Sequence, residues 1–267
     1  KSCGSERLQR VRRRVFCASL AEVFDNEVPD QWRVDLFKLI AATPNLDWLL
    51  LTKRIGNVAR MLGDHPTVPL LPNIWLGITV VNQAEVDRDV PKLLRVPAAV
   101  RFLSVEPMLG PVDLTAVPVG GGHGHHEFEP IITGNVLRRA DREAPHVHWV
   151  ICGGESGPKA RPMHPDWARS LRDQCAAAGV PFLFKQWGEW AEVDGDKPTR
   201  TVQVESDIGE TLASRCDGFI SQAGEFVRSM DDAATDDPYR GMVRIGKKAA
   251  GRLLDGRTHD GFPGGAS

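Results

Sequence analysis

The sequence lacks the features that mark membrane and secreted proteins. No apolar run approaches the roughly 20 residues that a bilayer-spanning helix needs. No long apolar segment follows the basic stretch around Arg12–Arg14, so no signal peptide is predicted. The formal net charge of −2 gives no general attraction to nucleic acid or to anionic lipid. We therefore expect a soluble, cytoplasmic protein with no membrane partner.

Cysteine is also scarce, and its spacing excludes the common metal motifs. The cysteines lie far apart, with no C-x-x-C pair: Cys3, Cys17, Cys152, Cys175 and Cys216. We predict reduced thiols, several of them packed as small apolar side chains, and no metal site. A G-x-G-x-x-G turn is absent too, which argues against an open, doubly wound dinucleotide-binding sheet.

What is present is an alternation of apolar strands with amphipathic helices. Strands are predicted near residues 15, 48, 74, 101, 148 and 182. Helices are predicted over 30–43, with Asp30 as N-cap, and over 56–62, 82–96 and 164–179, the third interrupted near Pro91. This alternation is typical of an α/β fold with a parallel sheet. Because the glycine-rich turn of the open sheet is missing, we predict a partial or closed parallel (βα) barrel over residues 10–190.

Two regions depart from this alternation. Residues 115–146 contain 120-GGGHGHHEFEP-130 and are predicted to form an insertion loop. The histidines His123–His126 in it are either metal ligands or incidental loop residues. Residues 191–267 are predicted to be an appended region, not a second catalytic domain. Small strands are expected there at 202–206 and 219–222, and a terminal helix at 242–256.

Polar residues follow directly on every predicted strand. In the order of the six strands they are Ser19, Glu22 and Asp25; Thr52, Lys53 and Arg54; Thr79 and Asn82; Ser104 and Glu106; Gly153, Gly154, Glu155 and Ser156; and Lys185, Gln186 and Glu189. The functional residues of parallel β/α folds lie at the carboxyl ends of the strands, on one face. We therefore predict a shared polar site on that face.

Two of these positions could bind a charged ligand. Lys53 and Arg54 would clamp a carboxylate or a phosphate, or would form a surface charge pair. Gly153 and Gly154 would let the backbone approach a ligand closely. Glu155 would then accept hydrogen bonds from an amine or a ribose hydroxyl, or act as a base. Its alternatives are to cap a helix or to pair with Lys185 or Arg161.

Other positions leave further alternatives open. Glu106 and Glu155 together would suit the paired carboxylates of a glycosidase-type hydrolase. Trp187 and Trp190 would stack on a base or a sugar, or would pack in the core at the rim of the barrel.

Five segments resemble a phage- and prophage-associated family that is described by a three-cysteine motif and grouped with the radical S-adenosylmethionine proteins. These segments are 15-VFCASLAEVFDNEVP-29, 48-WLLLTKR-54, 102-FLSVEPMLGPVDL-114, 150-VICGGESGPKARPMHPDWARSLRDQC-175 and 182-FLFKQWGEW-190. The stretch 244-RIGKKAAGRLLDGR-257 resembles the end of that family. The resemblance covers most of residues 10–190 and part of the tail.

The resemblance implies a barrel of radical S-adenosylmethionine type. Such a barrel holds a [4Fe-4S] cluster on three cysteines, and S-adenosylmethionine ligates the fourth iron; its cleavage gives a 5′-deoxyadenosyl radical that abstracts hydrogen from a substrate. The phage association suggests a nucleic-acid substrate. Within this picture we expect roles from the positions at the strand ends: catalytic for Lys53, Glu106 and Glu155; cofactor-binding for Thr79, Ser104, Gly153, Gly154, Glu155 and Ser156; and substrate-binding for Asp25, Arg54, Lys185, Gln186 and Trp187.

One departure from the resembled family concerns the cluster. The three cysteines of that family precede the segment that matches 15-VFCASL-20, whereas here only Cys3 does. Because such a cluster normally needs three thiolates, we do not expect it in this chain alone. We expect a fragment or a degenerate member, with association through an exposed barrel edge. The alternatives are a non-catalytic barrel that binds a nucleotide-like ligand or a partner, and the glycosidase-type hydrolase.

Overall fold

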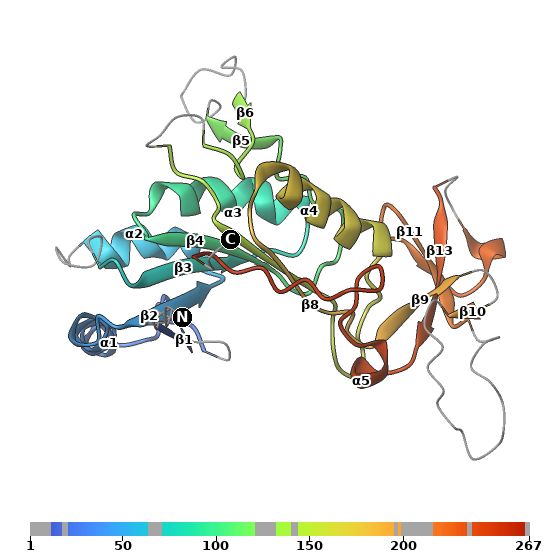
Figure 1. Cartoon of the computed structure of the whole chain (residues 1–267), viewed down its shortest axis with the longest axis horizontal. Coiled ribbons are helices and arrows are strands. Elements are labelled where there is room, and N and C mark those ends of the chain that lie inside the picture. The colour runs from blue at the N-terminus through green and yellow to red at the C-terminus, as the bar shows by residue number, and fades with distance from the viewer. Residues whose placement is uncertain are drawn as a thin grey trace, which may run out of the picture.

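The core of the protein is a parallel six-stranded sheet. The computed structural model describes residues 12–17, 21–63, 71–120, 132–139, 144–194, 197–198, 216–233 and 237–264. The sheet has the order β1-β2-β3-β4-β7-β8 (Figure 1). Its strands are β1 (Arg13–Cys17), β2 (Leu46–Thr52), β3 (Ile74–Thr79), β4 (Val100–Val105), β7 (Trp149–Gly153) and β8 (Phe182–Gln186). All six predicted strands are confirmed, and they form a parallel half-barrel, since β1 and β8 are its two edges.

Helices connect most of the successive strands. They are α1 (Asp30–Ala42), α2 (Ile55–Gly63), α3 (Gln83–Arg95) and α4 (Pro165–Ala178). The Asn82 side chain accepts a hydrogen bond from the Glu85 backbone N–H and caps α3. Gly179 ends α4 with a left-handed φ of 70°, a conformation that glycine adopts readily. Two predictions fail in detail: α3 continues through Pro91, and Asp30 is the first residue of α1 and not its cap.

The two faces of the sheet have different neighbours. Side chains alternate along a strand, so every second residue points to the same face. On one face, Leu50, Ile78 and Leu103 belong to the large core that the sheet shares with helix residues such as Ile40 and Leu93. On the other, Leu49, Trp75, Phe102, Trp149 and Ile151 form a separate apolar cluster. This second face is the inner face of the half-barrel.

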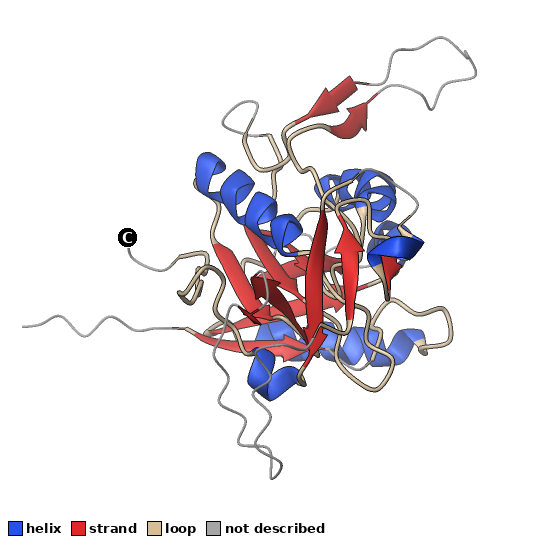
Figure 2. Ribbon diagram, turned by 90° about the vertical axis from the view of Figure 1, so that its right-hand side faces the viewer, coloured by secondary structure: helices blue, strands red, loops and turns tan. Residues whose placement is uncertain are grey.

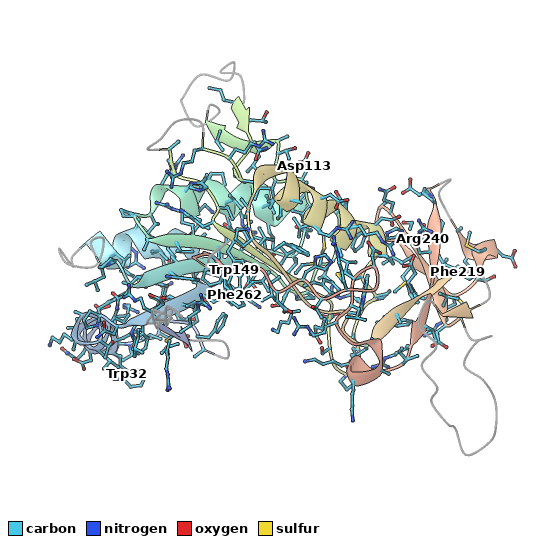
Figure 3. The ribbon with its side chains drawn as sticks, viewed as in Figure 1. Trp32, Asp113, Trp149, Phe219, Arg240 and Phe262 are labelled. Atoms are coloured by element: carbon cyan, nitrogen blue, oxygen red, sulfur yellow. The ribbon has the colours of Figure 1, made fainter. Side chains whose placement is uncertain are left out.

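The end of the chain lies along the β8 edge and over the inner face. The Phe184 backbone N–H donates to the carbonyl of His259 at 2.9 Å, and the Gly261 N–H donates to that of Phe182 at 3.0 Å. The ring centroid of Phe262 lies 4.6 Å from that of Trp149 (Figure 3). We call residues 259–262 the C-terminal strap. It closes the apolar half of the inner face and covers the edge of β8.

Residues after β8 form a second, antiparallel sheet. Its order is β10-β9-β13-β11-β12, with β9 (Trp190–Asp194), β10 (Lys197–Pro198), β11 (Gly218–Ser221), β12 (Phe226–Val227) and β13 (Tyr239–Arg244). A short 3-10 helix (Met230–Asp232) follows β12, and α5 (Lys247–Ala250) follows β13. The small strand predicted at 219–222 is confirmed, and the one at 202–206 lies outside the described residues.

The terminal helix predicted over 242–256 is wrong. Its first residues belong to β13, where Met242 and Val243 are both fully buried. Only α5 is helical, and the glycines that flank it, Gly246 and Gly251, have φ angles of 84° and 65°. These left-handed angles stop an α-helix at both ends.

The predicted insertion loop contains a hairpin. Its strands are β5 (Val117–Gly120) and β6 (Ile132–Gly134), which stand away from the main sheet (Figure 2). The predicted insertion therefore includes a small sheet of its own, and His123–His126 lie outside the described residues. None of the described helices is long and apolar enough to cross a membrane.

Candidate functional site

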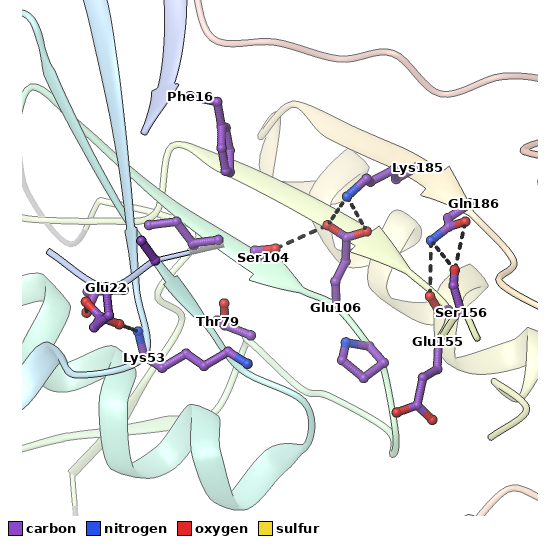
Figure 4. Close-up of a pocket in the computed structure, with 15 residues that line it drawn as sticks. Phe16, Glu22, Lys53, Thr79, Ser104, Glu106, Glu155, Ser156, Lys185 and Gln186 are labelled. Atoms are coloured by element: carbon purple, nitrogen blue, oxygen red, sulfur yellow. Dashed lines mark hydrogen bonds and ion pairs between the residues drawn. The ribbon is translucent and has the colours of Figure 1, made fainter. Parts of the chain in front are cut away.

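A cavity of about 680 Å³ lies at the carboxyl ends of the parallel strands (Figure 4). We call it the strand-end cavity. Residues predicted at the ends of all six strands line it: Glu22, Thr52, Lys53, Thr79, Ser104, Glu106, Gly154, Glu155, Ser156, Lys185 and Gln186. The prediction that separate strands would contribute polar groups to one place therefore agrees with the geometry.

Strand alternation explains how polar groups reach the cavity. Thr79 and Ser104 lie opposite each other in the register of β3 and β4, two residues beyond Gly77 and Phe102 in their own strands. Residues two apart share a face, so the hydroxyls stand directly above the apolar cluster of the inner face. The cavity thus has an apolar floor and polar walls.

Glu106 is a largely buried carboxylate of the cavity, and it is paired with Lys185. Its Oε1 lies 3.2 Å from Nζ of Lys185, and its Oε2 lies 3.3 Å from the same atom. The Ser104 hydroxyl donates to Oε2 at 3.3 Å. The Glu106 side chain is largely buried, with 15% exposed. A carboxylate and an ammonium are therefore presented together on one wall.

Two adjacent glycines make room for this arrangement. A Cβ on Gly153 would lie 2.5 Å from Oε1 of Glu106. A Cβ on Gly154 would lie 1.9 Å from the carbonyl oxygen of Trp187. Both distances are shorter than a normal non-bonded contact, so a side chain at 154 would clash with fixed backbone, and one at 153 would displace the Glu106 carboxylate. The groups that approach these two glycines closely are the Glu106 side chain and the Trp187 backbone.

The opposite wall carries Lys53. The loop before it is held by Glu22, whose carboxylate accepts from the Thr52 hydroxyl at 2.6 Å and from the Lys53 backbone N–H at 2.8 Å. Figure 4 shows the Lys53 side chain extending along the cavity. Among the described residues its ammonium has no hydrogen bond or ion pair. It is therefore a cation that a ligand can use.

The third wall comes from the turn after β7. Nε2 of Gln186 donates to the Ser156 hydroxyl at 3.2 Å and to the Gly154 carbonyl at 3.3 Å. Glu155 is paired with Arg161 through two bonds of 2.8 Å. The hydrogen bonds from Arg161 lower the pKa of the Glu155 carboxyl below its ordinary value. Glu155 is thus ionised at neutral pH and already has a cationic partner.

Some predicted site residues lie elsewhere. Arg54 forms an ion pair with Asp25 at 2.8 Å, and neither lines the strand-end cavity. Trp187 is buried, and its indole N–H donates to the carbonyl of Leu253 at 2.8 Å. Core packing is therefore the role of Trp187 that the structure supports. Ser19 lies outside the described residues.

The prediction missed Phe16, Ala21, Leu51 and Pro107, which also line the cavity. Phe16 lines the cavity and is 44% exposed, although its strand reads as a buried one. It pairs in register with Leu49 of the inner face, so the same alternation points both side chains inward. The pairing of Phe16 with Leu49 could have indicated that Phe16 lies on the inner face.

The described thiols do not form a cluster site. Cys152 and Cys175 are fully buried in the core. Burial raises the pKa of the Cys175 thiol to about 12 and that of Cys152 above its ordinary value, whereas a metal ligand must be a thiolate. The described residues contain no group of three His, Cys, Asp or Glu side chains that could hold a metal ion.

Comparison with known proteins places the chain in a family. A family described as a protein of unknown function (DUF5131) matches residues 5–263. The chain belongs to this family. No curated protein and no solved structure matches the chain. The match covers both the half-barrel and the antiparallel sheet.

Proposed function

We propose that the half-barrel binds a nucleoside-like zwitterion of the S-adenosylmethionine class in the strand-end cavity. The observation that carries the proposal is the separation of charges across that cavity. The Lys53 ammonium, which has no ion pair among the described residues, lies on one wall, and Glu106 lies on another. Lys53 would bind the carboxylate of the ligand's amino-acid group. Glu106 and the hydroxyls of Ser104, Ser156 and Thr79 offer partners for its amine and ribose hydroxyls.

The radical S-adenosylmethionine lineage, the phage association and a cytoplasmic location belong to this proposal. The resemblance of the strand-end motifs and the parallel half-barrel support the lineage. When bound, a [4Fe-4S] cluster would supply the electron that cleaves S-adenosylmethionine. Because the described cysteines do not fit that cluster, we derive no radical step and propose ligand binding alone for this chain. A nucleic-acid substrate rests on the phage association.

The glycosidase-type alternative is less well supported. Glu106 and Glu155 line the same cavity, but each is in an ion pair with its own cation. Figure 4 shows the two carboxylates pointing in opposite directions. A glycosidase needs both to face one sugar ring.

Titration calorimetry with S-adenosylhomocysteine tests the proposal. We expect Lys53→Met to weaken binding about tenfold or more, because a hydrogen bond to a charged group contributes about 1.5–3 kcal/mol. Lys38→Met is the control, since Lys38 lies on the exposed surface of α1. 5′-Methylthioadenosine lacks the amino-acid group, so its affinity should be unchanged by Lys53→Met.

Two outcomes would contradict the proposal. One is no measurable binding of S-adenosylhomocysteine, and the other is an equal loss of affinity in both lysine variants. Iron and sulfide analysis after anaerobic reconstitution distinguishes a chain that only binds the ligand from an active enzyme. We expect no cluster; about four irons per chain with formation of 5′-deoxyadenosine would show an active enzyme instead.

A further inference from the structure

A second cavity lies beyond the turn that carries Glu155. It measures about 630 Å³, within the range of small-molecule sites. The loop 158–162, the start of α4 and the antiparallel sheet line it. None of its lining residues belongs to the strand-end cavity. We call it the basic cavity.

Positive charge dominates this cavity. Its lining includes the cations Lys159, Arg161, Arg228 and Arg244, against the single carboxylate of Asp217. Arg161 is neutralised by Glu155. Lys159 and Arg228 are exposed and have no ion pair among the described residues. The cavity therefore keeps an excess of positive charge that would attract an anion.

Hydrogen bonds hold one of these cations, the guanidinium of Arg244, in place. Its Nη2 donates to the carbonyl of Gly157 at 2.8 Å, and its backbone N–H donates to Asp217 at 2.8 Å. Its Nε is buried and has no hydrogen-bond partner among the described residues. The guanidinium is thus fixed at the cavity wall with donor capacity left over, which is the state in which arginine recognises phosphate.

Aromatic rings form the remaining wall. The indole N–H of Trp190 donates to the Ala160 carbonyl at 2.8 Å, and that of Trp167 donates to the Gln222 carbonyl at 2.7 Å. Phe226 is half-buried and packs edge-on against Trp190, with ring centroids 5.3 Å apart. Both indoles are anchored, and that of Trp190 supports Phe226, which is the ring with surface left to contact a ligand.

We propose that the basic cavity binds a nucleoside phosphate, either free or as one unit of a single strand. Cations beside an aromatic surface recognise nucleotides through phosphate contacts and base stacking. Lys159, Arg228 and Arg244 bind the phosphate, and Phe226 contacts the base. The inference stands on this cavity alone and does not depend on the ligand of the strand-end cavity, so either can fail without the other.

Fluorescence anisotropy of a labelled twelve-nucleotide deoxythymidine strand tests the proposal. The variant Lys159→Gln/Arg228→Gln should bind about tenfold or more weakly at low salt. The slope of log affinity against log salt should fall by about 1.4, because each lost phosphate contact removes about 0.7 from a single strand. Lys38→Gln/Arg95→Gln removes the same charge from exposed positions on α1 and α3 and should bind like the wild type.

Competition identifies the source of the nucleotide and the role of the ring. Displacement of the strand by thymidine monophosphate at millimolar concentration would assign a free nucleotide; displacement only by longer strands would assign nucleic acid. Phe226→Leu should weaken strand binding about fivefold or more and leave competition by pyrophosphate unchanged. The proposal is overturned if the strand and the monophosphate both fail to bind, if both double variants lose affinity equally, or if an acidic peptide binds better than either.

Discussion

At the scale of single residues, two adjacent glycines determine the shape of the strand-end cavity. Gly153 leaves room for the Glu106 carboxylate, and Gly154 leaves room for the backbone at Trp187. The neighbours differ in how far they can move, because a carboxylate ends a flexible side chain while a backbone carbonyl is fixed in the chain. The same substitution should therefore have different consequences at the two positions.

We predict that Gly153→Ala changes binding and that Gly154→Ala changes stability. The new Cβ at 153 should displace Glu106 from Lys185, lowering affinity for S-adenosylhomocysteine about tenfold with little change in the free energy of unfolding. The Cβ at 154 should clash with backbone and cost about 3 kcal/mol, at the upper end of overpacking effects. Urea unfolding and calorimetry on both variants check this. Equal stability of the two variants would contradict the assigned contacts.

Residue types predicted which positions form the site, but not how they pair. The rule that functional groups gather at strand ends was enough to place Lys53, Ser104 and Glu106 in one cavity. The sequence left open whether Glu155 pairs with Lys185 or with Arg161. The choice depends on the path of the 153–161 turn in space, which no local pattern encodes.

At the scale of elements, the half-barrel strands were predictable because parallel strands covered on both faces are continuously apolar. The antiparallel sheet was not, since β9 pairs with β13 far along the chain and neither strand has a long apolar run. The helix predicted over 242–256 does not form, because Gly246 and Gly251 interrupt it with positive φ angles. The basic cavity is formed by the packing of this sheet, so it could not be predicted from the sequence either.

The C-terminal strap is an element whose attachment can be tested. A Cβ on Gly261 would lie 2.8 Å from both the backbone N and O of Phe182. We expect Gly261→Ala to loosen the strap and to lower the free energy of unfolding by about 2 kcal/mol. Gly56→Ala is the matched control, because a Cβ there meets nothing within 4 Å and alanine favours a helix.

Hydrogen exchange locates the effect of this change. The amides of Phe184 and Gly261, which bond across the strap, should exchange faster in Gly261→Ala. Unchanged exchange at both amides would contradict the role of the strap as a cover for β8.

At the scale of the whole molecule, the two edges of the half-barrel are unequal. The strap covers β8, whereas no described residue pairs with the outer edge of β1. Phe16 on β1 and Trp32 and Leu39 on α1 are exposed apolar side chains, and Trp32 points away from the sheet (Figure 3). Along this edge Arg12 pairs with Asp47, and the Arg14 guanidinium lies over the Phe262 ring, whereas Arg13 has no ion pair among the described residues. The charge of Arg13 limits strand pairing between molecules.

Association through the β1 edge remains a prediction. We expect the amount of dimer to depend on the salt concentration. Because salt screens the repulsion between arginines, we expect more dimer at 500 mM than at 50 mM sodium chloride in sedimentation velocity. Phe16→Ser/Trp32→Ser should reduce the dimer. A chain that is monomeric at both salt concentrations would contradict the prediction.

The most direct test of the central claim is hydrogen exchange of the whole chain with and without S-adenosylhomocysteine. Binding at the strand ends predicts protection of 52–54, 104–108, 153–157 and 185–187, with no change in 217–244. These segments are far apart in sequence and meet at the strand-end cavity. Protection confined to 217–244, or no protection anywhere, would show that the half-barrel does not use its strand ends as we propose.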